Sequence, residues 1–236
     1  MKHSISGSTI GYIDVSVPLS AKVPMWPGAP PFEIHEEKIP LGKKDVITVS
    51  NLKLTAHCGT HIDAPLHFDK NGATIDAADL SLLMGHCRVF HHKHRRHITR
   101  ADLAALGDDL PPRVLFKTVN SARLHAGKLD KNFISLLPDA IEELLARGVR
   151  VLGVDGFSIG PYGPISDSNH VRYCGTGGLI IEVMDLTAVK PGDYFLVALP
   201  LKILRAEAAP ARVILFKPED APVPGGIKLR HKSSQT

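Results

Sequence analysis

The sequence has few of the features that mark exported, membrane-bound or nucleic-acid-binding proteins. It contains only three cysteines among 236 residues, and so sparse and odd a count forms no disulfide framework and favours a reducing cytoplasm. No run of about 18 apolar residues is present, and residues 1–11 lack the apolar core of a signal peptide. The formal net charge of +4 is too small to argue for a nucleic-acid partner.

The length and composition indicate one globular domain. Of all residues, 44% are hydrophobic and 22% are charged, which is an ordinary balance for a protein that buries a core. We predict a single α/β domain over residues 1–216, with a mixed β-sheet and flanking helices. Residues 217–236 are rich in Pro, Gly, Ser and Lys and are expected to form a flexible tail.

Hydrophobic periodicity places the expected elements. Strands are predicted at 12–17, 45–55, 87–91, 113–118, 150–155, 179–181, 193–200 and 211–216, and helices at 77–84, 99–106 and 135–147. The charged segment 33–38 is expected to face solvent. The order strand, helix, strand between residues 113 and 155 is typical of an α/β unit.

One stretch, residues 56–68, concentrates groups that can bind metals or transfer protons. His57, His61, Asp63 and His67 all occupy odd positions, whereas the even positions are small or apolar apart from Thr60. In an extended chain this period of two places all four polar side chains on one face. Glycine and proline within the stretch count against a regular helix, so we predict a strand.

The chemistry of these side chains suits a divalent metal. Imidazole nitrogens and a carboxylate oxygen are ligands of zinc, and manganese is an alternative. We interpret His57, His61 and Asp63 as metal ligands, which leaves His67 as a nearby base. The alternative is a histidine-rich, half-buried strand whose rings only form hydrogen bonds. It is disfavoured because unpaired polar groups on a packed strand are costly.

The same stretch, His57-Cys-Gly-Thr-His61-Ile-Asp63-Ala-Pro-Leu-His67-Phe68, resembles the signature H-x-G-[TA]-H-x-D-x-P-x-H-[FY] of the metal-dependent cyclase family. That family contains bacterial kynurenine formamidases and isatin hydrolases. The resemblance extends over about residues 12–216. It implies a swivelling β/β/α-like fold, a homodimer and one or two divalent ions per subunit.

The resemblance also implies two further ligands, His170 and, twelve residues later, Glu182, where the local match is the pattern Ile-Ile-Glu-x-x-x-Leu at 180–186. On its own, Glu182 could equally be a glutamate in water at the end of a strand. If both residues bind metal, one ion is held by His57, His61 and Asp63, and a second by Asp63, His170 and Glu182, with Asp63 and Glu182 as bridging ligands.

Loop 155–164 follows a predicted strand end, where sites often lie in α/β folds. The family usually has Asp-Thr-x-Ser-Ile/Leu-Asp here, whereas this chain keeps Asp155 and Ser158 but has Gly156 and Gly160. We interpret Asp155 as a structural carboxylate that caps the loop, in preference to a third metal ligand.

Trp26 is the only tryptophan and lies on a stiff, proline-rich loop. It could be a core anchor or a subunit contact, because large aromatic side chains dominate both. A similar Trp-Pro-Gly segment lines the site in kynurenine formamidases, so the resemblance implies a substrate-binding role for Trp26.

The resemblance therefore implies a metal-dependent arylformamidase that converts N-formyl-L-kynurenine to L-kynurenine and formate in tryptophan degradation, with His67 as proton shuttle. A close alternative is the isatin-hydrolase-like opening of a cyclic amide or lactone with manganese. An alternative of another class is a non-catalytic metal-binding or redox-sensing module that uses Cys58, in which His67 would have no purpose. The basic run 91–97 is interpreted as a solvated strand end or loop, because like charges repel and no aromatic residue is interleaved for nucleic-acid stacking.

Overall fold

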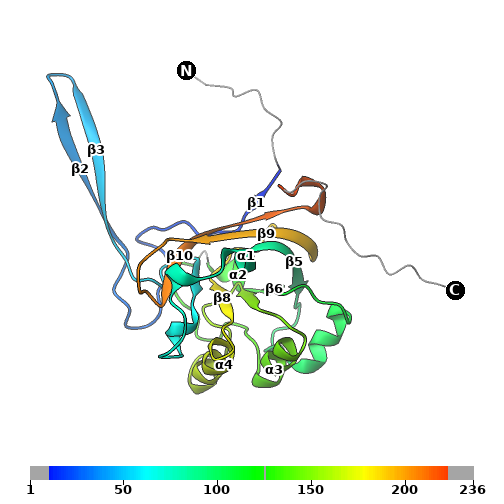
Figure 1. Ribbon diagram of the computed structural model, residues 1–236. Coiled ribbons are helices and arrows are strands. Elements are labelled where there is room, and N and C mark those ends of the chain that lie inside the picture. Colours follow the sequence, from blue (N-terminus) through cyan, green and yellow to red (C-terminus); the bar gives the residue numbers. More distant parts are fainter. Residues whose placement is uncertain (1–10, 125, 223–236) are drawn as a thin grey trace.

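A computed structural model describes residues 11–124 and 126–222 (Figure 1). Its strands are β1 (Ile13–Asp14), β2 (Glu33–Leu41), β3 (Asp45–Lys53), β4 (His61–Asp63), β5 (Met84–His91), β6 (Arg113–Lys117), β7 (Val151–Val154), β8 (Leu179–Glu182), β9 (Gly192–Pro200) and β10 (Ala208–Phe216). Its helices are α1 (Leu80–Leu83), α2 (Asn120–Leu124), α3 (Pro138–Ala146) and α4 (Pro164–Cys174), with 3₁₀ turns η1 (Pro65–His67), η2 (Ile75–Ala77), η3 (Arg100–Leu106) and η4 (Pro218–Asp220).

The main sheet closes on itself. Its strand order is β1-β10-β4-β8-β7-β6-β5-β9, and β10 also pairs with β9, so that every strand except β1 belongs to a seven-stranded barrel. Strands β5 to β8 run parallel, and the remaining pairs are antiparallel. The prediction of a single mixed α/β domain is confirmed. The topology supports this general description and not the narrower swivelling β/β/α label.

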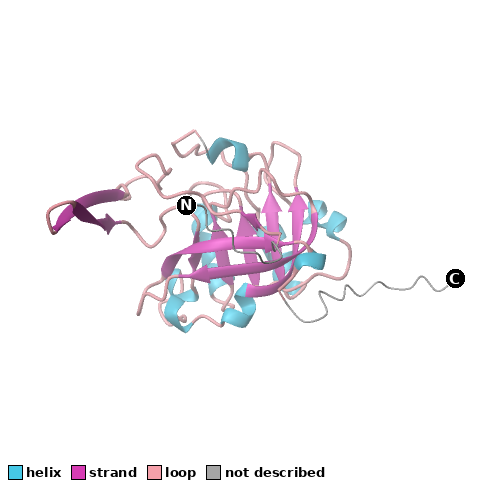
Figure 2. Cartoon of the chain, turned by 90° about the horizontal axis from the view of Figure 1, so that it is seen from above, coloured by secondary structure: helices cyan, strands magenta, loops and turns pink. Residues whose placement is uncertain are grey.

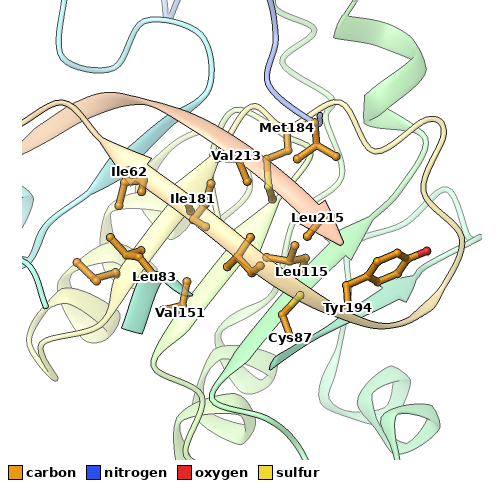
Figure 3. Close-up of a cluster of buried hydrophobic side chains, with 14 of the residues drawn as sticks. Ile62, Leu83, Cys87, Leu115, Val151, Ile181, Met184, Tyr194, Val213 and Leu215 are labelled. Atoms are coloured by element: carbon orange, nitrogen blue, oxygen red, sulfur yellow. The ribbon is translucent and has the colours of Figure 1, made fainter. Parts of the chain in front are cut away.

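The barrel interior is a packed apolar core (Figure 3). All seven barrel strands contribute to it, for example through Ile62, Leu115, Ile181 and Val213, which are all fully buried. Because successive strand residues point to opposite faces, the neighbours of these side chains lie on the outside of the barrel. In β4 this leaves His61 and Asp63 on the outer face.

Helices α3 and α4 cover the outer face of β6 to β8 and lie together below the sheet in Figure 1. A second apolar cluster fills this layer and includes Phe116, Ile141, Leu152 and Tyr173. Helix α3 begins at Pro138, where a proline is favourable at the first helical position. This start lies three residues after the beginning of the predicted helix at 135–147.

Strands β2 and β3 form a separate hairpin that extends away from the barrel (Figures 1 and 2). All of its strand residues except Glu33 are exposed. Exposed large apolar side chains lie along it: Ile34, Ile39, Leu41, Val46, Ile47, Val49 and Leu52. The segment 33–38 does face solvent, as expected, but it does so as a strand.

The remaining predicted elements are present, with shifted ends. Helix α1 is shorter than predicted, and helix 99–106 is the 3₁₀ turn η3, with a capping box between Thr99 and Asp102. Helices α2 and α4 were not predicted. Of the expected tail, residues 223–236 lie outside the described residues, so the domain boundary at residue 216 stays a prediction.

Among the described residues, no helix combines the length and apolar character needed to cross a membrane.

Candidate metal centre

The centre is built on the outer face of the barrel, where β4 pairs with β8. His61 lies opposite Glu182, and Asp63 lies opposite Ile180. The intervening Ile62 and Ile181 point into the barrel core. Strand pairing therefore places one imidazole and two carboxylates together on the surface that α4 covers.

The prediction of one extended strand over residues 56–68 is wrong outside β4. His57 lies in a turn before the strand, where Gly59 has φ +65° and an added Cβ would approach the Leu19 side chain to 2.5 Å. After the strand, Pro65 begins the 3₁₀ turn that carries His67. The two turns fold both histidines back over β4, so that the ring centroids of His57 and His67 lie 4.3 Å apart.

Helix α4 supplies His170 from the other side of the centre. Its side chain is buried, and the ring stacks on Phe68 at a centroid distance of 4.7 Å. Its Nδ1 lies 2.8 Å from the carbonyl oxygen of Ser166. With Nδ1 held in this way, the Nε2 atom is presented to the carboxylates of Asp63 and Glu182.

The five predicted ligands form two triads that share Asp63. One triad is His57, His61 and Asp63, the other is Asp63, His170 and Glu182, and within each triad the ligand atoms lie within 4.8 Å of one another. Asp63 Oδ1 is 2.9 Å from His57 Nδ1 and 3.4 Å from His61 Nε2. Glu182 lies 3.3 Å from His170 Nε2 through Oε1, and 3.6 Å from His61 Nε2 through Oε2.

Unsatisfied polar atoms indicate that this arrangement is suited to a cation. Both carboxylate oxygens of Asp63 and Nε2 of His61 are buried and take part in no well-aligned hydrogen bond among the described residues, although His57 Nδ1 lies 2.9 Å from Asp63 Oδ1. Asp63 is 0% exposed, and a buried carboxylate without full compensation by positive charge and hydrogen bonds is expensive. Nitrogen and oxygen donors of this kind fit zinc or manganese, so the residues present suit a divalent ion on either side of Asp63.

The electrostatics of the centre favour charged carboxylates and set His67 apart. The pKa of Asp63 lies below its usual range although burial opposes ionisation, because His61 and His57 adjoin it. Burial would lower the pKa of His57, but the neighbouring carboxylates, Asp63 first among them, raise it to about 9. Burial lowers the pKa of His67 to about 4 despite the attraction of Asp63. His67 is thus a neutral imidazole at pH 7.

A strained backbone segment fixes the end of β8. Val183, which directly follows Glu182, has φ +59°, a conformation that costs a β-branched residue on the order of 1–3 kcal/mol. Hydrogen bonds hold it there: its carbonyl accepts from the Thr60 hydroxyl at 2.6 Å, and its amide donates to Gly156. The ligand-bearing end of β8 is thereby tied to the turn before β4. In the sequence, Thr60 stands out as the one polar residue at an even position within 56–68. Nothing in the sequence predicts the positive φ of Val183.

Asp155 is a structural carboxylate, as predicted, and is not part of either triad, but it holds residues 118–121 where it was expected to cap loop 155–164. It accepts hydrogen bonds from the amides and hydroxyls of Thr118 and Ser121 and from the Asn120 side chain, and so fixes the start of α2. In the same loop a Cβ at Gly160 would lie 2.5 Å from Ser166 Cα. The close approach of the loop to α4 therefore explains a glycine at this position.

Trp26 lies in an aromatic group with Tyr162 and Phe133. Its ring centroid is 5.1 Å from Tyr162 and 6.4 Å from Phe133, and its side chain is 38% exposed. Tyr162 precedes α4, the helix of His170. Val23, on the same loop as Trp26, packs against Cys58, which follows His57. The loop thus adjoins elements that carry ligands of both triads.

The structure also bears on two segments for which the sequence offered a functional alternative, Cys58 and the basic run 91–97. Cys58 is buried and packs against Val23 and Phe32, so its role is in the core. The basic run 91–97 is a strand end followed by a loop: His91 ends β5, and residues 93–96 are exposed. Arg96 pairs with Asp102 through two hydrogen bonds of 2.6 Å, whereas His92 is buried.

Comparison with known proteins gives the following relations. Residues 13–161 match the model of the Cyclase family, whose description reads Putative cyclase. A predicted metal-dependent hydrolase from Bacillus stearothermophilus is 35% identical, with a TM-score of 0.73 over 87% of this chain and 98% of that one. A potential metal-dependent hydrolase with cyclase activity is 33% identical, with a TM-score of 0.70 over 88% and 98% of the two chains. Isatin hydrolase A from Labrenzia aggregata, bound to benzyl benzoate, shares the fold at 21% identity, with a TM-score of 0.75 over 88% and 93%.

The shared carboxylate predicts how metal content responds to substitution. Asp63→Ala should abolish binding of both zinc ions, whereas His170→Ala should abolish one, because Asp63 alone belongs to both triads. Metal analysis after zinc loading and desalting measures this directly. At zinc concentrations 100-fold above Kd, each occupied site should stabilise the wild-type protein by about 2.7 kcal/mol.

The matched control is His94→Ala, which removes an exposed histidine outside both triads and should leave zinc content and stabilisation unchanged. Retention of both ions by Asp63→Ala would contradict the shared-ligand arrangement.

Proposed function

We propose a function for this chain from the premise that it belongs to the Cyclase family. Its similarity to metal-dependent hydrolases is a property of the whole domain, since the matches cover 87% and 88% of the chain. The proposed activity is hydrolysis of a small aryl amide, with N-formyl-L-kynurenine converted to L-kynurenine and formate. The observation that carries this proposal is the pair of triads that share Asp63, with a neutral His67 beside them.

In this proposal, His57, His61 and Asp63 hold one divalent ion, and Asp63, His170 and Glu182 hold another, with zinc favoured and manganese as the alternative. When bound, the ions would polarise the substrate carbonyl and lower the pKa of water to about 7. The buried, hydrogen-bonded histidines hold this arrangement in place before substrate arrives, so little reorganisation is needed.

His67 is proposed to move the proton. Its ring lies 4.3 Å from that of His57 and 5.8 Å from that of His170, so it borders both triads without belonging to either. Because its pKa is lowered to about 4, the imidazole has a free lone pair at pH 7. It accepts the proton of the attacking water and passes it to the leaving nitrogen as the carbon–nitrogen bond breaks.

Trp26 is proposed to bind the aryl group. Its indole is partly exposed and packs against Tyr162, which leaves ring surface for a flat substrate. Aromatic stacking of this kind contributes about 0.5–1.5 kcal/mol beyond the area that it buries.

We also propose that the protein acts in tryptophan catabolism in a reducing cytoplasm. The free, buried thiols of Cys58, Cys87 and Cys174 are compatible with this compartment.

The second candidate activity is opening of a cyclic amide or lactone. It is supported by the fold shared with isatin hydrolase A. Loop 155–164, where glycines replace the residues usual for the family, excludes neither activity. A non-catalytic metal-binding module is less well supported, because a centre saturated by protein ligands gives His67 no purpose.

We also propose that the chain forms a homodimer, supported by the exposed hairpin β2–β3. The cross-strand pairs Ile34–Leu52 and Ile39–Ile47 lie on opposite faces of the hairpin, and all four side chains are exposed. An isolated two-stranded hairpin is only marginally stable in water. A second copy of this chain would cover these faces and stabilise the hairpin.

The dimensions of the hairpin are sufficient for this interface. Strands of nine residues form a ribbon about 30 Å long and about 10 Å wide, which offers about 300 Å² on each face. Two hairpins that each bury both faces would remove about 1,200 Å², the lower limit for a stable interface.

The dimer proposal predicts that Ile39→Glu combined with Ile47→Glu shifts the protein from dimer to monomer in light-scattering measurements. The charges would oppose burial of an apolar cross-strand pair. The control is Thr48→Glu, which places its charge opposite Lys38 and should preserve the dimer. A wild-type protein that is monomeric at all concentrations would contradict the proposal.

The proposed activity predicts fast hydrolysis of N-formyl-L-kynurenine by the zinc-loaded protein. Removal of metal by a chelator should reduce the rate to background, and added zinc or manganese should restore it. If protein confirmed to hold metal leaves this substrate intact but opens isatin, the cyclic-amide alternative is correct. If it hydrolyses neither, both candidate activities are wrong.

The role of His67 predicts that His67→Ala lowers kcat by about 10²- to 10⁴-fold, because a positioned proton carrier contributes that much. Zinc content should stay at the wild-type value, since His67 belongs to neither triad. Steady-state kinetics with metal analysis on the same samples measures both quantities. A variant that keeps its full rate would show that another group carries the proton.

A further inference from the structure

We propose that Glu207 is a positioning residue of the metal centre: its carboxylate accepts a hydrogen bond from Nε2–H of His57 and so directs Nδ1 of that ring toward the ion. This inference rests on the metal-dependent function proposed above. Neither the sequence motif nor the comparisons assign a role to Glu207, which lies 150 positions from His57 in the chain.

The two nitrogens of His57 face different carboxylates. Nε2 lies 3.2 Å from Glu207 Oε1, and Nδ1 lies 2.9 Å from Asp63 Oδ1. Since Asp63 belongs to both triads, its side of the ring is the metal side. Glu207 lies outside both triads, so it contacts the ring only through the nitrogen that does not bind metal.

His57 needs such a contact more than the other histidine ligands do. His61 and His170 are only 4% and 5% exposed, and Nδ1 of each lies 2.8 Å from a backbone carbonyl, that of Gly59 or of Ser166. His57 is 28% exposed, and its second nitrogen contacts a side chain. Packing restrains the first two rings, whereas the hydrogen bond to Glu207 restrains the third.

The nitrogens that bind metal also differ. His61 and His170 would bind through Nε2, because Nδ1 of each is occupied, whereas His57 would bind through Nδ1. A carboxylate acceptor on the second nitrogen fixes the tautomer and raises the basicity of the ring, and loss of such a partner typically costs 10- to 100-fold in metal affinity.

The backbone beneath Glu207 is well fixed. Its carbonyl accepts from the amide of Ala64 at 2.8 Å, beside Asp63, and the carbonyl of Ala206 accepts from Ile75 at 2.9 Å. Arg205 adopts φ +63°, and its amide donates to Asp76 Oδ1 at 2.9 Å. A residue held in this uncommon conformation next to a functional site is consistent with a loop that must place one side chain accurately.

The test is a titration of metal-free protein with zinc in competition with a chromophoric chelator, which resolves the two sites. Glu207→Ala should weaken one site by about 10- to 100-fold and leave the other within about threefold of wild type. Glu207→Gln should recover most of the loss, because its amide oxygen accepts the same hydrogen bond. Thermal unfolding of the metal-free variants should match wild type, since the Glu207 side chain is 41% exposed.

Glu142→Ala is the matched control. Glu142 is 45% exposed and has one ionic partner at 3.2 Å, Arg172, on the protein surface, so its loss should leave both zinc affinities unchanged. Wild-type affinity at both sites of Glu207→Ala, or equal losses in Glu207→Ala and Glu207→Gln, would overturn the proposal for Glu207. A wild-type protein that binds neither zinc nor manganese would instead contradict the proposed metal-dependent function.

Discussion

Burial of the Asp63 carboxylate is the constraint on which the centre depends. The side chain is fully buried, and neither oxygen takes part in a well-aligned hydrogen bond among the described residues. Such a group costs several kcal/mol unless positive charge adjoins it. Three separate elements bring nitrogens to it: the turn before β4 brings His57, β4 itself brings His61, and α4 brings His170. A divalent cation would complete the compensation that these imidazoles begin.

The barrel makes this burial possible because it fixes β4 on both edges. Although β4 has only three residues, it pairs with β10 on one side and β8 on the other. Ile62 anchors it in the core, while the outer face holds the ligands under α4. The strained Val183 and the Thr60 hydroxyl then tie the end of β8 to the turn that precedes β4. The ligands therefore converge from rigid elements and not from loops alone.

Much of this could be predicted from the sequence, because the information is local. The motif within 56–68 pointed to His57, His61 and Asp63, which the structure brings together in one triad, and apolar periodicity located most barrel strands. What could not be predicted depends on contacts distant in sequence. Helix α4 has a weakly amphipathic sequence that gives no clear helical pattern, and its Pro164 and preceding glycines suggest a loop. The contact between His57 and Glu207 and the closure of β9 onto β10 arise only when distant segments pack. The turns at Gly59 and Pro65 interrupt the strand predicted over residues 56–68, and these turns place the rings of His57 and His67 side by side.

In the proposed arrangement, Asp63 lies between two metal ions on the outer face of the barrel. The most direct test is a crystal structure of the zinc-loaded protein with anomalous diffraction measured on both sides of the zinc absorption edge. Two anomalous peaks are expected, one among His57, His61 and Asp63 and the other among Asp63, His170 and Glu182. Zinc peaks located only away from Asp63, in a protein loaded to at least one ion per chain, would contradict this arrangement.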